Sequence, residues 1–379
     1  MIPVFFSGGS SIQEVLAPGK LVDVDGLTIS NGGSANNTGQ ALHHLGVKVE
    51  IVGKISDDMI GNAVMDNLRP LGPDVTRHMI ISPGETSSYT IIINPPGIDR
   101  VFIHSQSTNA TFVASELPEE ALEGVRVMHY GYPPLMAGFF ANDGIETKKL
   151  FERARAKGIT TSLDMARPDP NAPSGRIDWP RLLENVLPVV DLFLPSIDEM
   201  IYMFDRKRFD GLLAKSDSAN PAAFLDIEMI SALADKFLAM GPAVVCFKLG
   251  DQGFYLKTTS SHRRMEAIGR LAPKDIPAWT GKELAVPCFK VDVVGTTGAG
   301  DATIAGFLAG MLKGLTPDEA ALMAVGTGGE SVEALDSASG VHPWDSIVKR
   351  IAAGWPQNRS AIIPESWSRT AAGVRHPHR

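Results

Sequence analysis

The chain contains a glycine-rich turn that leads directly into a carboxylic acid, in the stretch DVVGTTGAGDATIAGFLAGML from Asp292 to Leu312. Valines before the turn predict the end of a strand, and apolar residues at helical spacing after it predict a buried helix that stops at Gly314. The free amides and positive dipole end of such a helix attract an anion. Asp301, in the first turn, could accept the proton of a hydroxyl group. The two features together suit phosphoryl transfer to a hydroxyl, although a capped helix after a turn explains the pattern better if it stands alone.

A second glycine motif lies nearer the N-terminus, in NGGSANNTGQALHHLGVKVEIVGKISDDMIGN from Asn31 to Asn62. Gly32 and Gly33 precede apolar residues that predict a helix ending at Gly46. Taken alone, this stretch is explained more simply by an N-capped helix after a flexible turn.

The two stretches together resemble the two signature motifs of the ribokinase-like (PfkB) family of sugar and nucleoside kinases, in the same order and at a similar separation. With lower density the resemblance extends from about residue 16 to about residue 351. It implies an α/β fold, a three-layer αβα sandwich with a mostly parallel central sheet and a small β-sheet lid. The kinase domain is expected over residues 1–354, with the lid from about 17–30 and 84–112. Residues 355–379 are expected to form a disordered C-terminal tail.

The resemblance also implies site residues. Asp301 becomes the catalytic base, and the amides of residues 298–300 (Gly298, Ala299 and Gly300) become the anion hole. Substrate contacts are implied for Gly32, Gly33, Asn37, Asn109 and Asp301. Nucleotide contacts are implied for Lys248, Gly250, Gly253, Thr297, Gly298 and Gly300. Glu199 would organise Mg²⁺ through water, which suits an ion that keeps much of its hydration shell, although an acid in the first turn of a helix has the same local pattern.

Strand-like and helical segments alternate through the middle of the chain. Strands are predicted at 125–130, 160–163, 189–194, 244–249 and 253–256, and helices at 145–157 and 227–240. Such alternation is typical of parallel strands joined by helices, whose ligands bind at the carboxyl ends of the strands. Polar candidates follow these strands: Asp164, Arg167, Ser196, Glu199 and Lys248.

The sequence departs from the family pattern in three places. Ser196 replaces the expected asparagine in LPSIDEM. The substrate-binding aspartate of the opening strand has no counterpart, because Asp23 and Asp25 lie too far along the chain, in a segment that predicts a lid strand. Residues 205–224 and 258–289 lack strong periodicity and are interpreted as insertions.

Composition narrows the classes of function. A chain of 379 residues with 44% hydrophobic content can bury a large core, and its net charge of −8 disfavours nucleic-acid or membrane-surface binding. Its two cysteines, Cys246 and Cys288, suggest neither a disulfide framework nor a zinc site. With no apolar run of membrane-spanning length and no convincing signal peptide, a cytoplasmic location is expected.

The leading hypothesis is an ATP-dependent, Mg²⁺-dependent kinase that phosphorylates a hydroxyl of a sugar or sugar-like substrate. The alternatives are a nucleoside kinase of the same family, and a catalytically degenerate sugar-binding or regulatory protein on the same fold. No GxxxxGK[ST] motif occurs, so a P-loop enzyme is excluded. The resemblance adds two expectations, a homodimer through the lid and a monovalent cation such as K⁺ near the anion turn.

Overall fold

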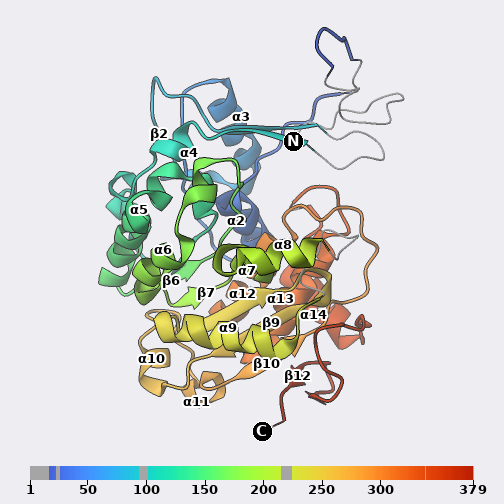
Figure 1. Ribbon diagram of the computed structural model, residues 1–379. Helices are drawn as coiled ribbons and strands as arrows, with labels where there is room; N and C mark the ends of the chain where they lie inside the picture. The colour runs from blue at the N-terminus through green and yellow to red at the C-terminus, as the bar shows by residue number, and fades with distance from the viewer. Residues whose placement is uncertain (1–16, 23–25, 94–100, 215–223, 338, 379) are drawn as a thin grey trace.

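Figure 1 shows the computed structural model of the chain, which describes residues 17–22, 26–93, 101–214, 224–337 and 339–378. Within these residues an eight-stranded sheet has the order β11-β12-β10-β9-β8-β7-β6-β5. Four neighbouring strands are parallel: β5 (Val127–Tyr130), β6 (Thr160–Leu163), β7 (Leu192–Phe193) and β8 (Val244–Lys248). The antiparallel strands are β9 (Phe254–Thr258), β10 (Glu283–Val286), β11 (Ser368–Arg369) and β12 (Arg375–His376). The alternation of strands and helices therefore predicted the parallel part of the sheet correctly.

Helices cover both faces of this sheet, because successive strand residues point to opposite sides. Leu192, Val244 and Cys246 belong to one apolar core, whereas Phe193 and Val245 belong to the other. The first core includes α2 (Ser34–His44), α12 (Ala299–Leu312), α13 (Pro317–Ser331) and α14 (Trp344–Ala352). The second includes α6 (Trp179–Val186), α7 (Ile197–Phe204), α8 (Arg206–Leu213) and α9 (Ile227–Met240). This is the three-layer sandwich expected from the sequence.

The remaining helices lie around these layers. They are α3 (Met59–Leu68), α4 (Thr108–Thr111), α5 (Ala137–Ala156), α10 (His262–Glu266) and α11 (Ile276–Trp279). The backbone of α5 leaves the helical conformation from Ala141 to Gly144, so the helix predicted at 145–157 is its second part. In the described part of the chain, no helix combines the length and the apolar character needed to cross a bilayer.

Helix α12, which carries Asp301, is largely buried. Ten of its residues are buried, and it packs against both α2 and α13. A Cβ at Gly306 would lie 2.4 Å from the Met323 carbonyl oxygen, so this glycine permits the close approach of α13. The helix is apolar on every side, which places the polar residue of its first turn in an apolar surrounding.

A two-stranded hairpin forms the lid that the sequence predicted. Strands β3 (Tyr89–Ile93) and β4 (Val101–Ser105) pair in antiparallel register, and Figure 1 shows them extending away from the main sheet. A further short pair, β1 (Lys54–Ile55) and β2 (Ile80–Ile81), is parallel. No described residue of 17–30 belongs to a strand, and Asp23 and Asp25 lie outside the described residues.

Two expectations about local structure were wrong. Residues 291–294 form no strand, because Val294 pairs only with the end of α13 through the Val332 carbonyl oxygen and its side chain is 53% exposed. The segment 258–289 is not a simple insertion, since it contributes β10 to the main sheet. The other segment interpreted as an insertion, residues 205–224, includes helix α8, whose Phe209 is buried, and its interpretation stays a prediction.

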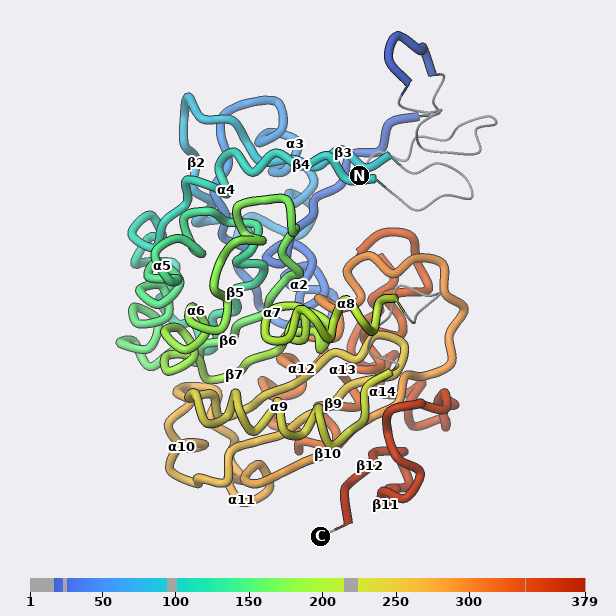
Figure 2. The backbone as a smooth tube through the Cα atoms, viewed as in Figure 1, coloured from blue at the N-terminus to red at the C-terminus, as the bar shows by residue number. Residues whose placement is uncertain are grey.

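The C-terminal tail is also integrated into the fold. Figure 2 shows the last residues running beside β10, where β12 pairs with that strand. Ile362, Ile363 and Val374 are buried, so apolar contacts fix a segment whose sequence has no visible periodicity. The expectation of a disordered tail is therefore corrected.

Replacing Val374 by alanine tests the contribution of the tail. Val374 is fully buried, so Val374→Ala should lower the free energy of unfolding by about 2 kcal/mol through lost apolar contact. Urea unfolding followed by circular dichroism measures this change. Val348→Ala is the matched control, because Val348 is 41% exposed. Equal stability of the two variants would contradict the packing of the tail.

Candidate active site

Asp301 lies in the first turn of α12, at the carboxyl end of the parallel strands. The turn before it reverses at Gly298, which has φ +78°, and a Cβ there would lie 2.4 Å from that of Ser337. Glycine is thus required at this position for both its conformation and its size. The carboxylate of Asp301 is only 1% exposed.

Three side chains donate hydrogen bonds to the Asp301 carboxylate. Asn37 Nδ2 and the Tyr132 hydroxyl donate to Oδ2, at 2.9 and 2.7 Å, and Thr38 Oγ1 donates to Oδ1 at 3.2 Å. Burial raises the pKa of Asp301, while these donors and the Lys248 ammonium act in the opposite direction. Desolvation is the larger of these effects, so this carboxyl group is harder to ionise than that of a free aspartate.

Asn37 connects the two glycine motifs. Its Oδ1 accepts hydrogen bonds from Asn36 Nδ2 at 3.1 Å and from Ser337 Oγ at 2.9 Å, in addition to the bond that its amide donates to Asp301. In the structure this side chain therefore holds the carboxylate in place. Its contact with substrate hydroxyls stays a prediction.

The amides of the turn and one lysine form a positive region beside Asp301. Within the described residues the Gly298 and Gly300 amides donate no hydrogen bond, whereas that of Ala299 donates to the Thr296 carbonyl oxygen at 3.3 Å. A Cβ at Gly300 would lie 3.6 Å from Lys248 Nζ, so the lysine lies directly against this turn.

Lys248 also pairs with Asp164, a buried acid that directly follows β6. Its Nζ lies 2.6 Å from Asp164 Oδ1, while Asp164 Oδ2 is buried without a hydrogen-bond partner in the described part of the chain. Burial raises the pKa of Asp164 to about 6, against the effect of the ammonium. Burial acts to lower the pKa of Lys248, but the carboxylates of Asp164, Glu199 and Asp301 raise it overall, so the lysine stays protonated.

Glu199 lies beside this pair and closes the first turn of α7. Its Oε2 accepts a hydrogen bond from the Ser196 amide at 2.8 Å, which is the helix-capping arrangement that the sequence also allowed. Burial raises the pKa of Glu199 well above its ordinary value. Among the described residues no three acidic, histidine or cysteine side chains form a metal-binding cluster. The orphaned Asp164 oxygen and the open amides of the turn fit a hydrated divalent cation and a phosphate chain, which need few direct protein ligands.

The other residues proposed from the sequence are less central. Gly32 and Gly33 border open space, since a Cβ at either would meet no atom within 4 Å. Gly253 has a structural role, because a Cβ there would lie 2.1 Å from the Val286 carbonyl oxygen. Asn109 lies in α4 at the base of the lid, and Gly250 follows β8 with φ +61°.

Sequence reasoning missed Tyr132 and Thr38. Tyr132 comes two residues after β5, so the rule that ligands bind at the carboxyl ends of strands pointed to its position. Nothing in the sequence showed that its hydroxyl reaches Asp301.

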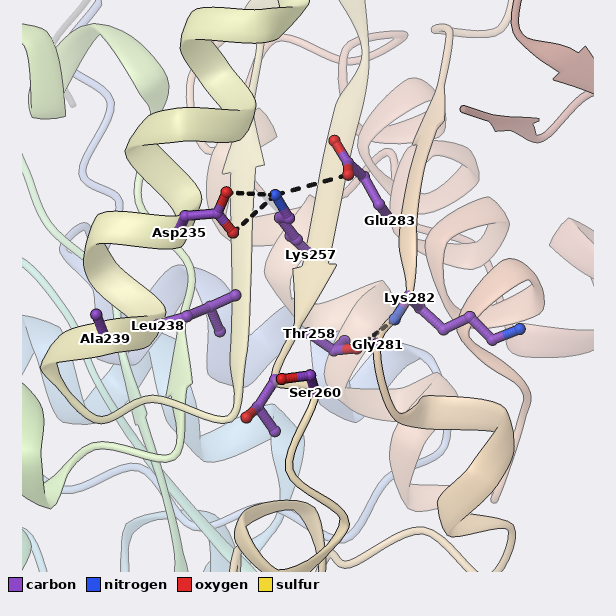
Figure 3. Close-up of a pocket in the computed structure, with 10 residues that line it drawn as sticks. Asp235, Leu238, Ala239, Lys257, Thr258, Ser260, Gly281, Lys282 and Glu283 are labelled. Carbon is purple, nitrogen blue, oxygen red and sulfur yellow. Dashed lines mark hydrogen bonds and ion pairs between the residues drawn. The ribbon is translucent and has the colours of Figure 1, made fainter. Parts of the chain in front are cut away.

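A separate cavity of about 350 Å³ lies at the opposite end of the sheet (Figure 3). Lys257 lines it and pairs with Asp235 at 2.7 Å and with Glu283 at 3.6 Å. In the antiparallel pair of β8 and β9, Lys257 lies opposite Val245, whereas Lys248 lies opposite Phe254 at the other end. The cavity is therefore not part of the candidate active site.

Known proteins resemble the chain over most of its length. Residues 10–343 match the model of the family described as pfkB family carbohydrate kinase. The 2-dehydro-3-deoxygluconokinase of Bacillus subtilis (strain 168) is 23% identical over 86% of this chain and 88% of its own length. A fructokinase with bound ATP from Xylella fastidiosa has a TM-score of 0.68 at 15% identity, covering 93% of this chain and 96% of its own. An E. coli chain assigned as a ribokinase II, in complex with ATP and Mg²⁺, has a TM-score of 0.63 at 21% identity, covering 93% of this chain and 96% of its own.

The buried acid predicts a measurable effect on stability. Since burial raises the pKa of Asp301 above its value in the unfolded chain, the protonated form favours folding, and this stability is lost as the pH rises through the folded-state pKa. Asp301→Asn should therefore raise the free energy of unfolding at pH 7 by about 0.5–2 kcal/mol, a usual gain at a strained functional position. Urea unfolding from pH 4 to 8 should show the gain increasing as the pH rises through the folded-state pKa of Asp301 and constant above it.

Glu120→Gln provides the control, because the Glu120 side chain is exposed and its loss should leave stability unchanged. A lower stability of Asp301→Asn at every pH would show that ionised Asp301 favours folding and would contradict the prediction.

Proposed function

The chain belongs to the pfkB family of carbohydrate kinases, and from this premise we propose that it transfers the γ-phosphate of ATP to a hydroxyl of a sugar or sugar acid. Asp301 is the base in this proposal, and the amides of residues 298–300 are the anion hole. One observation carries it: a carboxylate, open amides and a protonated lysine meet at the N-terminus of one buried helix.

The acid has the surroundings that a general base of this kind needs. Asn37 and Thr38 fix its orientation from α2, by donating to Oδ2 and Oδ1 respectively. A loose phosphoryl-transfer transition state demands little basicity, because the hydroxyl loses its proton late. Burial also strengthens every electrostatic interaction of the carboxylate with its neighbours.

The positive groups act on the other side of the reacting centre. Gly298 and Gly300 can direct their amides at the transferring oxygens, and Lys248 adds a full charge beside them. ATP supplies the phosphoryl group and Mg²⁺ neutralises part of its charge when both are bound. Asp164 and Glu199 would hold the hydrated ion, and a monovalent cation near the turn remains a family expectation.

The substrate is proposed as a sugar or sugar acid because the Bacillus subtilis relative is named for 2-dehydro-3-deoxygluconate. We propose that the sugar enters the site over Gly32 and Gly33, which is supported by the open space at both residues. Dimerisation through the lid is supported by Phe102 and Ile103 of β4, which are 57% and 48% exposed. A cytoplasmic location completes the proposal.

An acceptor panel with Asp301→Asn tests the proposal. ADP release should be measured with pentoses, hexoses, 2-keto-3-deoxy acids and nucleosides, each with Mg²⁺ and ATP. At least one sugar or sugar acid should support turnover, and Asp301→Asn should lower kcat by about 10²–10⁴, the contribution of a positioned base. Glu120→Gln should retain wild-type kcat.

Two results would contradict parts of this function. Undiminished turnover in Asp301→Asn would remove Asp301 from its role. Tight binding of a sugar without turnover would instead identify a non-catalytic binding protein, the alternative suggested by Ser196. Turnover with nucleosides alone would assign the chain to the nucleoside kinases.

The pH profile provides an independent test of the base. Asp301 must be ionised to accept a proton, so kcat/KM should rise with pH through its pKa. Because burial raises this pKa, the acid limb should lie above about 3.9, the pKa of a free aspartate. A profile measured from pH 4 to 8 that is flat down to pH 4 would contradict the buried base.

A further inference from the structure

Tyr132 makes the shortest hydrogen bond to Asp301 in the site. Its hydroxyl donates to Oδ2 at 2.7 Å, against 2.9 Å for Asn37 and 3.2 Å for Thr38. Asn37 and Thr38 project from helix α2, whereas Tyr132 lies in the connection between β5 and a short turn at Pro133–Leu135. The proposed base therefore already accepts a hydrogen bond from a hydroxyl group that belongs to the protein.

This bond is the one that an acceptor alcohol must form before it loses its proton. The acceptor hydroxyl has to donate to Asp301 within about 2.6–3.2 Å, and the phenol meets that condition. The Tyr132 hydroxyl thus stands in for an acceptor hydroxyl at Oδ2, so a substrate that approaches this oxygen competes with the phenol for it.

The phenol remains a donor under all ordinary conditions. Burial raises the pKa of Tyr132 well above its usual value, and the charges of Asp301 and Asp164 raise it further. An ionised phenolate would repel the carboxylate, whereas the neutral phenol covers it.

The backbone holds Tyr132 in a costly conformation. Its φ and ψ are 63° and 42°, in the left-handed region that bulky residues rarely adopt. Gly131 before it packs so closely on α2 that a Cβ would lie 2.0 Å from Ser34 Oγ. The side chain is therefore directed at Asp301 by its neighbours, and moving it away costs the hydrogen bond but can relieve backbone strain.

We propose that Tyr132 determines the selectivity of the reaction for a sugar alcohol over water, by occupying the acceptor position at Asp301 until a sugar displaces it. Water is a smaller nucleophile with the same O–H group, so an uncovered base next to bound ATP would promote hydrolysis. In that side reaction the water oxygen bonds to the γ-phosphorus, the bond to the ADP oxygen breaks, and the water proton passes to Asp301. The inference rests on the proposed function for the identity of the base.

The site around Tyr132 allows a sugar to perform this displacement. The space over Gly33 is open, and Ser34, the next residue, contacts Gly131. A sugar that binds there can replace the lost phenol bond with its own hydroxyl and gain contacts elsewhere. A water molecule has no such additional contacts.

Tyr132→Phe tests the inference without any knowledge of the natural sugar. ATP hydrolysis with Mg²⁺ and no acceptor should be about tenfold faster in Tyr132→Phe than in the wild type, the effect of losing a hydrogen bond to a charged group. Adding Asp301→Asn to this variant should remove the increase. An unchanged rate of hydrolysis in Tyr132→Phe would overturn the inference.

Tyr130→Phe is the matched control. Tyr130 lies two residues earlier, packs on Phe139 with ring centroids 4.9 Å apart and donates only to Met136 Sδ, at 3.2 Å. Removing the Tyr130 hydroxyl should leave the rate of ATP hydrolysis without an acceptor at the wild-type value. An increase equal to that of Tyr132→Phe would also overturn the inference, because it would show general loosening of the fold.

Kinetics with the best acceptor of the panel distinguish two roles of Tyr132, competition with the acceptor at Asp301 and orientation of the Asp301 carboxylate. If the phenol competes with the acceptor, Tyr132→Phe should lower the KM of the sugar about fivefold or more and leave kcat within about twofold. A lower kcat with an unchanged KM would overturn the inference, because Tyr132 would then orient Asp301 during the reaction.

The inference and the proposed function fail in different ways. A wild type that phosphorylates a sugar, with no rise in hydrolysis in Tyr132→Phe, rejects only the inference. Faster hydrolysis in Tyr132→Phe, without phosphorylation of any acceptor by the wild type, supports the cover over Asp301 and rejects the sugar kinase.

Discussion

Asp301 is a carboxylate at the start of a helix whose other side chains are buried among apolar neighbours. A buried charge is tolerated only where hydrogen bonds and opposite charges replace the lost water. The structure supplies them from three directions: α2 through Asn37 and Thr38, the end of β5 through Tyr132, and β8 through Lys248. The site therefore depends on the positions of α2, β5 and β8, because these elements carry the groups that stabilise the buried carboxylate.

Charge balance is the second constraint on this region. Asp164, Glu199 and Asp301 surround the single ammonium of Lys248, and burial raises the pKa of all three acids. A group of acids with one cation favours the arrival of another cation, which suits a site that binds phosphate together with Mg²⁺. The same imbalance of charge lowers the free energy of unfolding of the protein without ligands, as is common for functional sites.

The fold brings these groups together through the direction of its strands. β5, β6, β7 and β8 are parallel, so Tyr132, Asp164, Ser196 and Lys248 all follow carboxyl ends at one edge of the sheet. Strand β9 runs antiparallel to β8 and ends at the other edge, where β10 begins and the cavity around Lys257 lies. Lys257 in that cavity is paired with Asp235 and Glu283.

The sequence by itself determined the layers, the parallel strands and the glycine turn with Asp301. The layers and strands follow from the periodicity of apolar residues, and the turn follows from its closely spaced glycines. It did not reveal the strand role of β10 or the docked tail, since short strands depend on distant partners for their hydrogen bonds. Only the tertiary structure decided that Asn37 and Tyr132 both donate hydrogen bonds to Asp301, because 264 and 169 residues separate these pairs along the chain. Such hydrogen bonds depend on how the sheet places α2 and the end of β5 relative to the start of α12. No local sequence pattern specifies these relative positions.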